Sequence, residues 1–382
     1  MAMHPCPRHL TRAAAAVLLV TAAAFAADPQ AKDSSAGELP REVPLETLLA
    51  TRFDMAWILP ATRTLPGVDA AQQPVDIVKR AKALATMTFG PTAGAPPGAV
   101  PETSTRSFGD LVAAVLACGD DFRARDAWLS ALQAQRPEIW RACGAELVQL
   151  TRAEILRGPQ WDPEQDDDRD GIFMGRAFRA DCEGQRPWSK IDGDPLAQQA
   201  LGLLLADLET IKAIENDYTL YPSNVGASYE FIHGTAGSFC SAKDAQGRPV
   251  NALGMKFRQD LPFPYTHFDC DLRILNRLDD DGHLVTDIYS PSEDFDWMAG
   301  QDVFVPLLDG DGAFVGILCA RVFGFDIDGV PDGEEDVRVA LRSSLGNLKR
   351  RADRAFADHL AQGGTPRTLQ GAIPAFTLRG AR

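Results

Sequence analysis

The stretch that decides the predicted fold is Leu261-Pro-Phe-Pro-Tyr-Thr-His-Phe-Asp-Cys-Asp-Leu-Arg-Ile-Leu275. From Asp269 onward, charged residues alternate with apolar ones as far as Ile274, and this period of two is typical of a strand with one covered face. Similar alternation predicts further strands at 228–231, 253–258, 284–289, 303–308 and 314–323. The turns Asp279–Gly282 and Asp309–Gly312 are hairpin signals between neighbouring runs. We therefore predict an antiparallel sheet in the C-terminal half.

One long amphipathic helix follows these strands. Asp332 and Glu335, just after Pro331, resemble a capping box. An apolar stripe runs through the segment, which Gly363-Gly364 ends. The fold class that we predict is α+β, with a curved antiparallel β-sheet around a long C-terminal α-helix. Residues 363–382 are predicted to be a loose tail.

Residues 1–26 read as a signal peptide for export to the periplasm or the extracellular space. Two arginines precede an apolar run at Ala13–Ala24, and Ala24-Phe25-Ala26 has the small residues of a cleavage site. The apolar run is shorter than the roughly 20 residues that a membrane span needs. The competing interpretation is an N-terminal anchor that is retained. No further apolar run is long enough, so we expect no stable membrane span after removal of the signal.

The composition is acidic, with a formal net charge of −15 that becomes −17 once Arg8 and Arg12 leave with the signal. Such a charge disfavours nucleic acid as a partner, and a soluble exported protein is the simplest interpretation. Cys6 leaves as well, and the six remaining cysteines permit disulfides in an oxidising compartment. Cys118 and Cys143 flank a predicted helical hairpin, so this pair is the first candidate for a disulfide.

Residues 27–43 are polar and mixed, which predicts a flexible leader, and residues 44–157 form a predicted helical region. Helical periodicity is found at 75–87, 110–117, 123–135 and 137–156, and a proline-rich and glycine-rich loop covers 89–104. Asp194-Pro195 is predicted to open another helix, with Leu201, Leu204 and Leu208 on its apolar stripe.

An acidic turn precedes that helix. Asp166, Asp168 and Asp170 have the alternate spacing of calcium ligands, and Gly171 takes the sixth position of such a loop. The twelfth position is Ala177, so the bidentate glutamate of a calcium loop is missing. We favour a solvated acidic turn that leads into a strand at 172–178.

Five short segments resemble the START and polyketide-cyclase group of helix-grip domains. They are Trp161 with Asp170-Gly-Ile-Phe173, Ala206–Thr210, Leu261-Pro-Phe-Pro264, Phe325–Pro331, and the terminal helix with Leu345-x-x-Leu348. The resemblance covers 161–360, and we place the domain boundaries at 158–362. Phe268 precedes Asp269 where the group usually has arginine, and Ile327 stands where it has proline.

The resemblance implies a hydrophobic cavity between the sheet and the C-terminal helix, which holds a lipid, sterol or polycyclic molecule. We therefore expect a hydrophobic small molecule, lipid-like in character, as the partner, and no cofactor. The predicted lining consists of apolar positions on the strands and the final helix: Tyr229, Phe231, Met255, Phe257, Leu272, Ile288, Phe314, Leu318, Leu341 and Leu345. The alternative is that these side chains fill a solid core, which would make the chain a structural or interaction module.

A catalytic alternative uses the same cavity. His267 and Asp269 are two residues apart in a predicted strand, so an imidazole and a carboxylate would lie on one face, as acid–base chemistry requires. A cyclase-like or hydrolase-like reaction is the corresponding hypothesis. Zinc-ligand spacings, a phosphate-binding glycine loop and a dinucleotide fingerprint are all missing from the sequence. We favour binding without catalysis.

Overall fold

The computed structural model describes residues 41–42, 44, 76–90, 100–152, 170–175, 177–179, 196–216, 232–244, 246–260, 267–290, 295–327, 334–367 and 373. The predicted signal peptide lies outside these residues. In the predicted leader, Arg41–Glu42 form the short strand β1.

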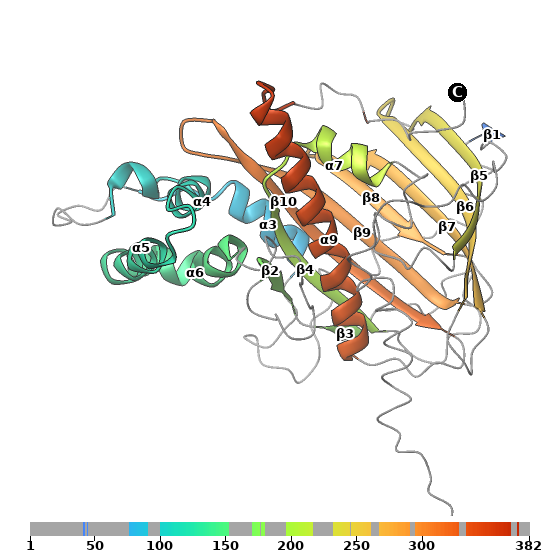
Figure 1. Cartoon of the computed structure of the whole chain (residues 1–382), viewed down its shortest axis with the longest axis horizontal. Coiled ribbons are helices and arrows are strands. Elements are labelled where there is room, and N and C mark those ends of the chain that lie inside the picture. The colour runs from blue at the N-terminus through green and yellow to red at the C-terminus, as the bar shows by residue number, and fades with distance from the viewer. Residues whose placement is uncertain are drawn as a thin grey trace, which may run out of the picture.

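Ten strands of the described residues form one sheet (Figure 1). Besides β1, the strands are β2 Ile172–Met174, β3 Phe178–Arg179, β4 Leu196–Leu204, β5 Ile232–Lys243, β6 Pro249–Asp260, β7 His267–Leu278, β8 Leu284–Tyr289, β9 Phe295–Leu308 and β10 Phe314–Ile327. Their order is β1-β5-β6-β7-β8-β9-β10-β4-β2, and β3 also pairs with β4. Strands β5 to β10 follow one another as an antiparallel meander, and β4 extends it by pairing with β10. The antiparallel sheet predicted from the period-two runs is confirmed.

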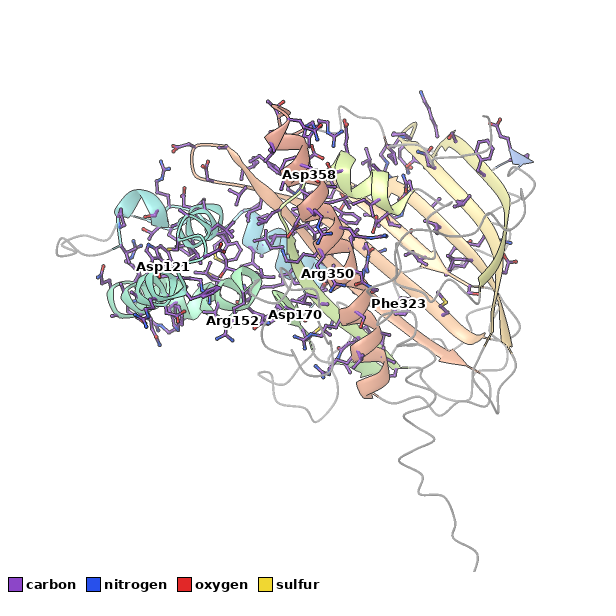
Figure 2. The ribbon with its side chains drawn as sticks, in the orientation of Figure 1. Asp121, Arg152, Asp170, Phe323, Arg350 and Asp358 are labelled. Atoms are coloured by element: carbon purple, nitrogen blue, oxygen red, sulfur yellow. The ribbon has the colours of Figure 1, made fainter. Side chains whose placement is uncertain are left out.

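One face of the sheet, called the inner face below, is covered by the helices α7 (Leu208–Glu215) and α9 (Glu334–Ala361). Helix α9 packs against β4, β10, β2 and α7. Its Leu341, Leu345 and Leu348 form a buried cluster with Ile317 and Cys319 of β10. Arg342 of the same helix pairs with Asp170 at the start of β2 (Figure 2). The predicted terminal helix is therefore confirmed, and Gly363, with a φ of 83°, follows its last turn.

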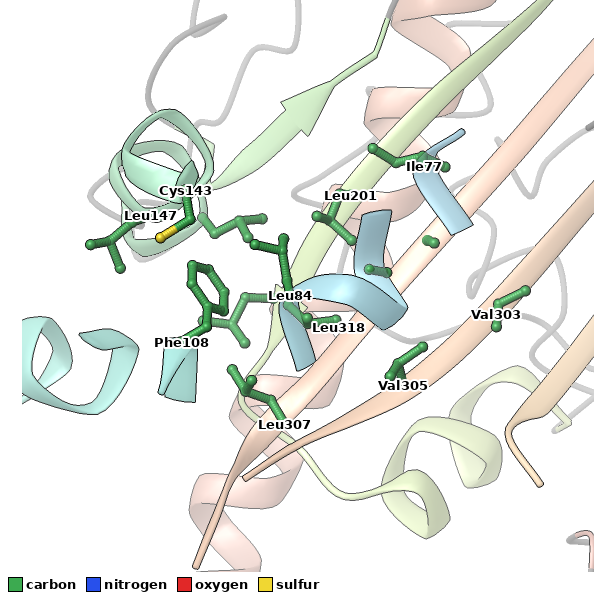
Figure 3. Close-up of a cluster of buried hydrophobic side chains, with 14 of the residues drawn as sticks. Ile77, Leu84, Phe108, Cys143, Leu147, Leu201, Val303, Val305, Leu307 and Leu318 are labelled. Atoms are coloured by element: carbon green, nitrogen blue, oxygen red, sulfur yellow. The ribbon is translucent and has the colours of Figure 1, made fainter. Parts of the chain in front are cut away.

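The opposite, outer face is covered near β4 by the N-terminal helices. These are α3 (Ile77–Ala85), α4 (Phe108–Leu116), α5 (Phe122–Gln135), α6 (Pro137–Thr151) and the short 3-10 helix Glu102–Thr105. Ile77, Leu84 and Phe108 are fully buried against Leu318 and Leu201 of the sheet (Figure 3). The helices predicted at 75–87, 110–117 and 123–135 are thus present, the one predicted at 137–156 is present as far as Thr151, and their core is continuous with that of the sheet.

The helix predicted from Asp194-Pro195 is wrong for residues 196–204, which form strand β4. Every residue of β4 is buried, because α9 lies on its inner side and α3 and α6 on its outer side. A strand that is covered on both faces loses its polar alternation, and a continuous apolar run does not distinguish strand from helix. The helix begins only at Leu208, after the N-cap Asp207, which accepts a hydrogen bond from the Thr210 backbone N–H.

The disulfide predicted between Cys118 and Cys143 is wrong. Both side chains are free thiols, and each donates to the carbonyl one helical turn earlier, at Ala114 and Ile139. Cys182 and the side chain of Cys270 lie outside the described residues. Burial raises the pKa of the Cys143 thiol to about 12, so this thiol stays protonated at neutral pH.

The predicted loose tail is wrong at two positions. Arg367 donates from its backbone N–H and its side chain to Asp207, the N-cap of α7. Ile373 is buried in the inner cluster, and its carbonyl accepts from Asn251 Nδ2 of β6. Arg367 and Ile373 are therefore both held by side chains of the domain, Arg367 at the start of α7 and Ile373 at β6.

Candidate functional site

A row of polar side chains crosses the inner face of the sheet beneath α7. The backbone register aligns one residue from each of five consecutive strands, β6 to β10. These residues are Asn251, Asn276, Thr286, Asp302 and Arg321. The first four are buried, and the side chain of Arg321 is 11% exposed. A row of this kind in an otherwise apolar layer requires internal hydrogen bonds, because buried polar groups without partners are unfavourable.

Lys212 of α7 supplies one cation to this row. The side chain is fully buried. Its Nζ donates to Glu215 Oε2 at 2.5 Å, to Thr286 Oγ1 at 2.5 Å and to Asn276 Oδ1 at 3.1 Å. The ammonium also lies 4.7 Å from the ring centre of Phe304. These contacts attach α7 to strands β7, β8 and β9.

Arg321 and Asp302 form the second charged pair of the row. Arg321 Nε donates to Asp302 Oδ1 at 2.6 Å, and Nη2 donates to Oδ2 at 2.5 Å, so the pair is bidentate. Arg321 Nη1 also donates to Ser344 Oγ of α9 at 3.0 Å. Burial alone would lower the pKa of Arg321, but the Asp302 carboxylate outweighs burial and raises it. The guanidinium therefore stays charged and joins β10 to both β9 and α9.

Cys319 lies on the same face, one inner position from Arg321. Burial and the negative charge of Asp302 both raise the pKa of this thiol well above its ordinary value. A thiol in this state is a poor nucleophile, because the thiolate is the reactive form. The charged groups of the row are paired with one another, so the row holds secondary-structure elements together and has no activated nucleophile.

A second, apolar row lies next to the polar one. Leu253, Ile274 and Ile288 occupy paired positions on β6, β7 and β8. The row continues to Gly300, where a side chain would meet the Phe323 ring at 2.6 Å. Gly300 thus lets the ring of Phe323 lie flat over β9. The inner face is apolar on both sides of the polar row.

The structure places the predicted lining residues in different surroundings. Leu341 and Leu345 are buried in the inner cluster, and Phe314 contacts Phe356 of α9 edge-on with ring centres 6.3 Å apart. Leu272 is buried and Ile288 half-buried on strands β7 and β8. Tyr229 and Phe231 lie outside the described residues, as do the side chains of Met255 and Phe257.

Leu318 does not face α9, so its assignment to a lining beneath that helix is wrong. It belongs to the outer cluster, with Leu84 of α3 and Leu307 of β9 (Figure 3). Successive residues of a strand alternate between faces, and on β10 the odd-numbered Ile317 and Cys319 are the ones that face α9.

The predicted acid–base residues His267 and Asp269 are in β7, paired with Asp260 and Arg258 of β6. Their side chains lie outside the described residues, so the catalytic hypothesis stays a prediction. Of the calcium candidates, Asp166 and Asp168 also lie outside. Asp170 is buried, and its carboxylate accepts from Arg342 and from the Ile172 backbone N–H, so it is not placed to bind calcium.

Asp279, Asp281 and His283 bring three potential metal ligands within 4.8 Å of one another in the β7–β8 turn. Lys82 Nζ of α3 contacts both carboxylates, at 2.7 Å for Asp279 and 2.5 Å for Asp281. The Lys82 ammonium thus neutralises the two carboxylates that a metal ion would need. Its role is to attach α3 to the end of the sheet.

Comparison with known proteins gives matches among solved structures. No family model and no curated protein matches the chain. A STAR-related lipid transfer protein fragment from Xanthomonas axonopodis aligns at 12% identity and a TM-score of 0.31, covering 48% of this chain and 98% of that one. A START superfamily protein from Mycobacterium smegmatis aligns at 15% identity and 0.26, covering 42% and 97%. The di-domain ARO/CYC protein StfQ of the steffimycin biosynthetic pathway aligns at 13% and 0.27, covering 44% and 52%.

The chain has a helix-grip fold. The topology itself carries this assignment, since the β5–β10 meander is extended by β4 and the long α9 packs on the inner face of this antiparallel sheet. Among the residues that the structure describes, no helix has the length and apolar character needed to cross a bilayer.

Proposed function

We propose that this chain is an exported protein that binds a hydrophobic, lipid-like small molecule between α9 and the inner face of the sheet. The observation that carries the proposal is the buried apolar surface on the strands beyond those that α9 packs against. Leu253, Leu272 and Ile274 of β6 and β7 are each at most 5% exposed, whereas α9 packs on β4, β10 and β2. An apolar surface with a few fixed polar groups beside it is typical of a small-molecule site.

The polar row supports the proposal, because it lies between two apolar parts of the inner face and holds α7 and α9 in place over them. Lys212 and Arg321 hold α7 and α9 against the sheet through charged hydrogen bonds. A rigid frame of this kind keeps a binding surface preorganised, which lowers the entropic cost of binding.

Native mass spectrometry of the protein purified under mild conditions tests the proposal, together with uptake of the fluorescent fatty acid cis-parinaric acid. We expect a co-purified lipid or saturable uptake. The variant Ile288→Trp places an indole at a half-buried inner-face position and should reduce uptake. Leu308→Trp adds the same ring at a position that is 44% exposed and should leave uptake unchanged. A wild-type chain that carries no lipid and takes up no probe would overturn the proposal.

Export is tested separately by the mass of the protein recovered from cells that express the full chain. Cleavage after Ala26 would produce a mature chain that begins at Ala27. Recovery of the uncleaved chain in the cytoplasmic fraction would overturn the export proposal and leave the binding proposal standing.

A further inference from the structure

Two buried polar side chains on α9 each have one atom without a hydrogen-bond partner among the described residues. Ser343 is fully buried and Asn347 is 1% exposed. Within the part of the chain that the structure describes, Ser343 Oγ and Asn347 Nδ2 have no partner. The two residues are four positions apart, so they lie one above the other on one side of the helix. Buried polar atoms in this state are unfavourable for folding alone, and a bound ligand is one way to satisfy them.

The amide of Asn347 is oriented by its neighbour Arg350. Arg350 Nη2 donates to Asn347 Oδ1. A guanidinium has only donors, so the amide oxygen must face Arg350 and the amide nitrogen must face away from it. Asn347 Nδ2 is therefore a fixed donor that requires an acceptor, and the hydroxyl of Ser343 can donate to the same acceptor.

This side of α9 borders the inner face of the sheet. Ser344, next to Ser343, accepts the hydrogen bond from Arg321 of the polar row. Asn347 follows Ser344 by three residues, so the two share a side of the helix. Asn347 therefore lies on the side of α9 that carries the contact with Arg321, beside the inner face where we place the hydrophobic ligand.

The surroundings favour an anionic acceptor. Burial, together with the positive charges of Arg354 and Arg351, lowers the pKa of Arg350 to about 10. Arg350 remains protonated at neutral pH, and the three arginines place positive charge close to Asn347. A carboxylate accepts hydrogen bonds from several donors at once and gains from nearby positive charge.

We propose that Ser343 and Asn347 bind the carboxylate of an amphipathic ligand whose apolar part lies on the inner face of the sheet. This inference rests on the proposed function and adds the chemical class of the ligand, a long-chain carboxylic acid. The carboxylate accepts from Asn347 Nδ2 and Ser343 Oγ, and Arg350 acts through its hydrogen bond to Asn347 Oδ1.

The test compares cis-parinaric acid with its methyl ester at pH 7.5, by fluorescence titration of the full mature chain. We expect the wild-type chain to bind the acid more tightly than the ester. Asn347→Leu should weaken binding of the acid roughly tenfold, the loss expected for one hydrogen bond to a charged group, and should leave the ester unaffected. Asp358→Asn, at an exposed position of the same helix, serves as the control and should change neither affinity.

Ser343→Ala provides a second variant that removes a single atom, and it carries the test if Asn347→Leu does not fold. Equal wild-type affinity for acid and ester, with both variants unchanged, would overturn this inference while the proposed function stands. A wild-type chain that binds neither probe would instead overturn the proposed function.

Discussion

Asp170 and Arg342 form an ion pair in which both side chains are almost completely buried, at 0% and 2% exposure. Asp170 precedes β2 and also accepts a hydrogen bond from the Ile172 backbone N–H at 3.0 Å. Arg342 lies in α9. The pair therefore joins the long inner-face helix to the edge strand that follows the N-terminal helices.

Arg342→Met should destabilise the protein by about 3–5 kcal/mol, because it removes the cation that forms an ion pair with the buried Asp170 carboxylate. Urea unfolding measures the change. Arg354→Met, at an exposed position of α9, is the control and should alter the free energy of unfolding by less than about 0.5 kcal/mol. Equal changes in the free energy of unfolding for the two substitutions would show that the Asp170–Arg342 ion pair does not stabilise the fold.

Lys212→Met should also destabilise the fold, by about 3 kcal/mol, because Glu215 and Thr286 would lose the buried ammonium that donates to both of them. Among the described residues, Glu215 would keep only the longer contact with Arg321, at 3.5 Å. The loss should be greatest for α7, which Lys212 attaches to the sheet. Hydrogen exchange of the α7 amides, together with thermal unfolding, measures both effects. Lys79→Met, at an exposed position of α3, is the matched control. Unchanged protection of α7 would contradict this role for Lys212.

Stability should depend on pH through Asp207 and Arg367. Burial by itself raises the pKa of Asp207, but the hydrogen bonds from Arg367 and Thr210 outweigh it and lower the pKa below the ordinary 3.8. A depressed pKa in the folded state contributes stability above the unfolded-state value, and this contribution is lost as the pH falls through the folded-state pKa.

Arg367→Ala should therefore lower the free energy of unfolding at neutral pH. Below about pH 5, the free energy of unfolding of the variant should fall less with decreasing pH than that of the wild type. Urea unfolding of both proteins across this range measures the difference. Parallel pH profiles for the wild type and the variant would indicate that the ion pair at the start of α7 does not cause the acid sensitivity.

The sequence predicted the meander because charged and apolar residues alternate in β7 and because the turns Asp279–Gly282 and Asp309–Gly312 mark the hairpins β7–β8 and β9–β10. Strand β4 was missed because it is buried on both faces, its Gln198 and Gln199 included, and therefore shows no alternation of polar and apolar residues. Only tertiary packing on both faces distinguishes it from a helix. The loose tail was predicted because no periodicity marks Arg367 or Ile373, whose contacts lie more than 100 residues away.

Part of the polar row could have been predicted from the sequence. Counting outward from Leu278 and Leu284, the strand ends on either side of the Asp279–Gly282 turn, pairs Asn276 with Thr286, as the structure has it. The same count from the Asp309–Gly312 turn would pair Asp302 with Ala320, because a register shift between Phe314 and Gly316 moves the true partner to Arg321. A bulge of this kind leaves no clear mark in the sequence. The unpaired atoms of Ser343 and Asn347 depend on three-dimensional packing and could not have been predicted.

The hairpin turns offer a last prediction, based on backbone geometry alone. Gly282 has a φ of 81°, and among the described residues nothing lies within 4 Å of an added Cβ, so a side chain there would meet strain but no clash. Gly282→Ala should destabilise the protein by about 1–2 kcal/mol, since this is the steric cost of the left-handed conformation for an L-residue. Gly282→Asn should cost less, because asparagine tolerates that conformation better.

Gly90→Ala is the matched control, because Gly90 also has open space around it among the described residues and lacks a positive φ. Chemical denaturation of the three variants should therefore give the order Gly90→Ala, Gly282→Asn, Gly282→Ala from the most to the least stable. If Gly282→Ala is as stable as Gly90→Ala, the β7–β8 turn does not require the left-handed backbone. The register that pairs Asn276 with Thr286 would then have to be fixed by the strands themselves.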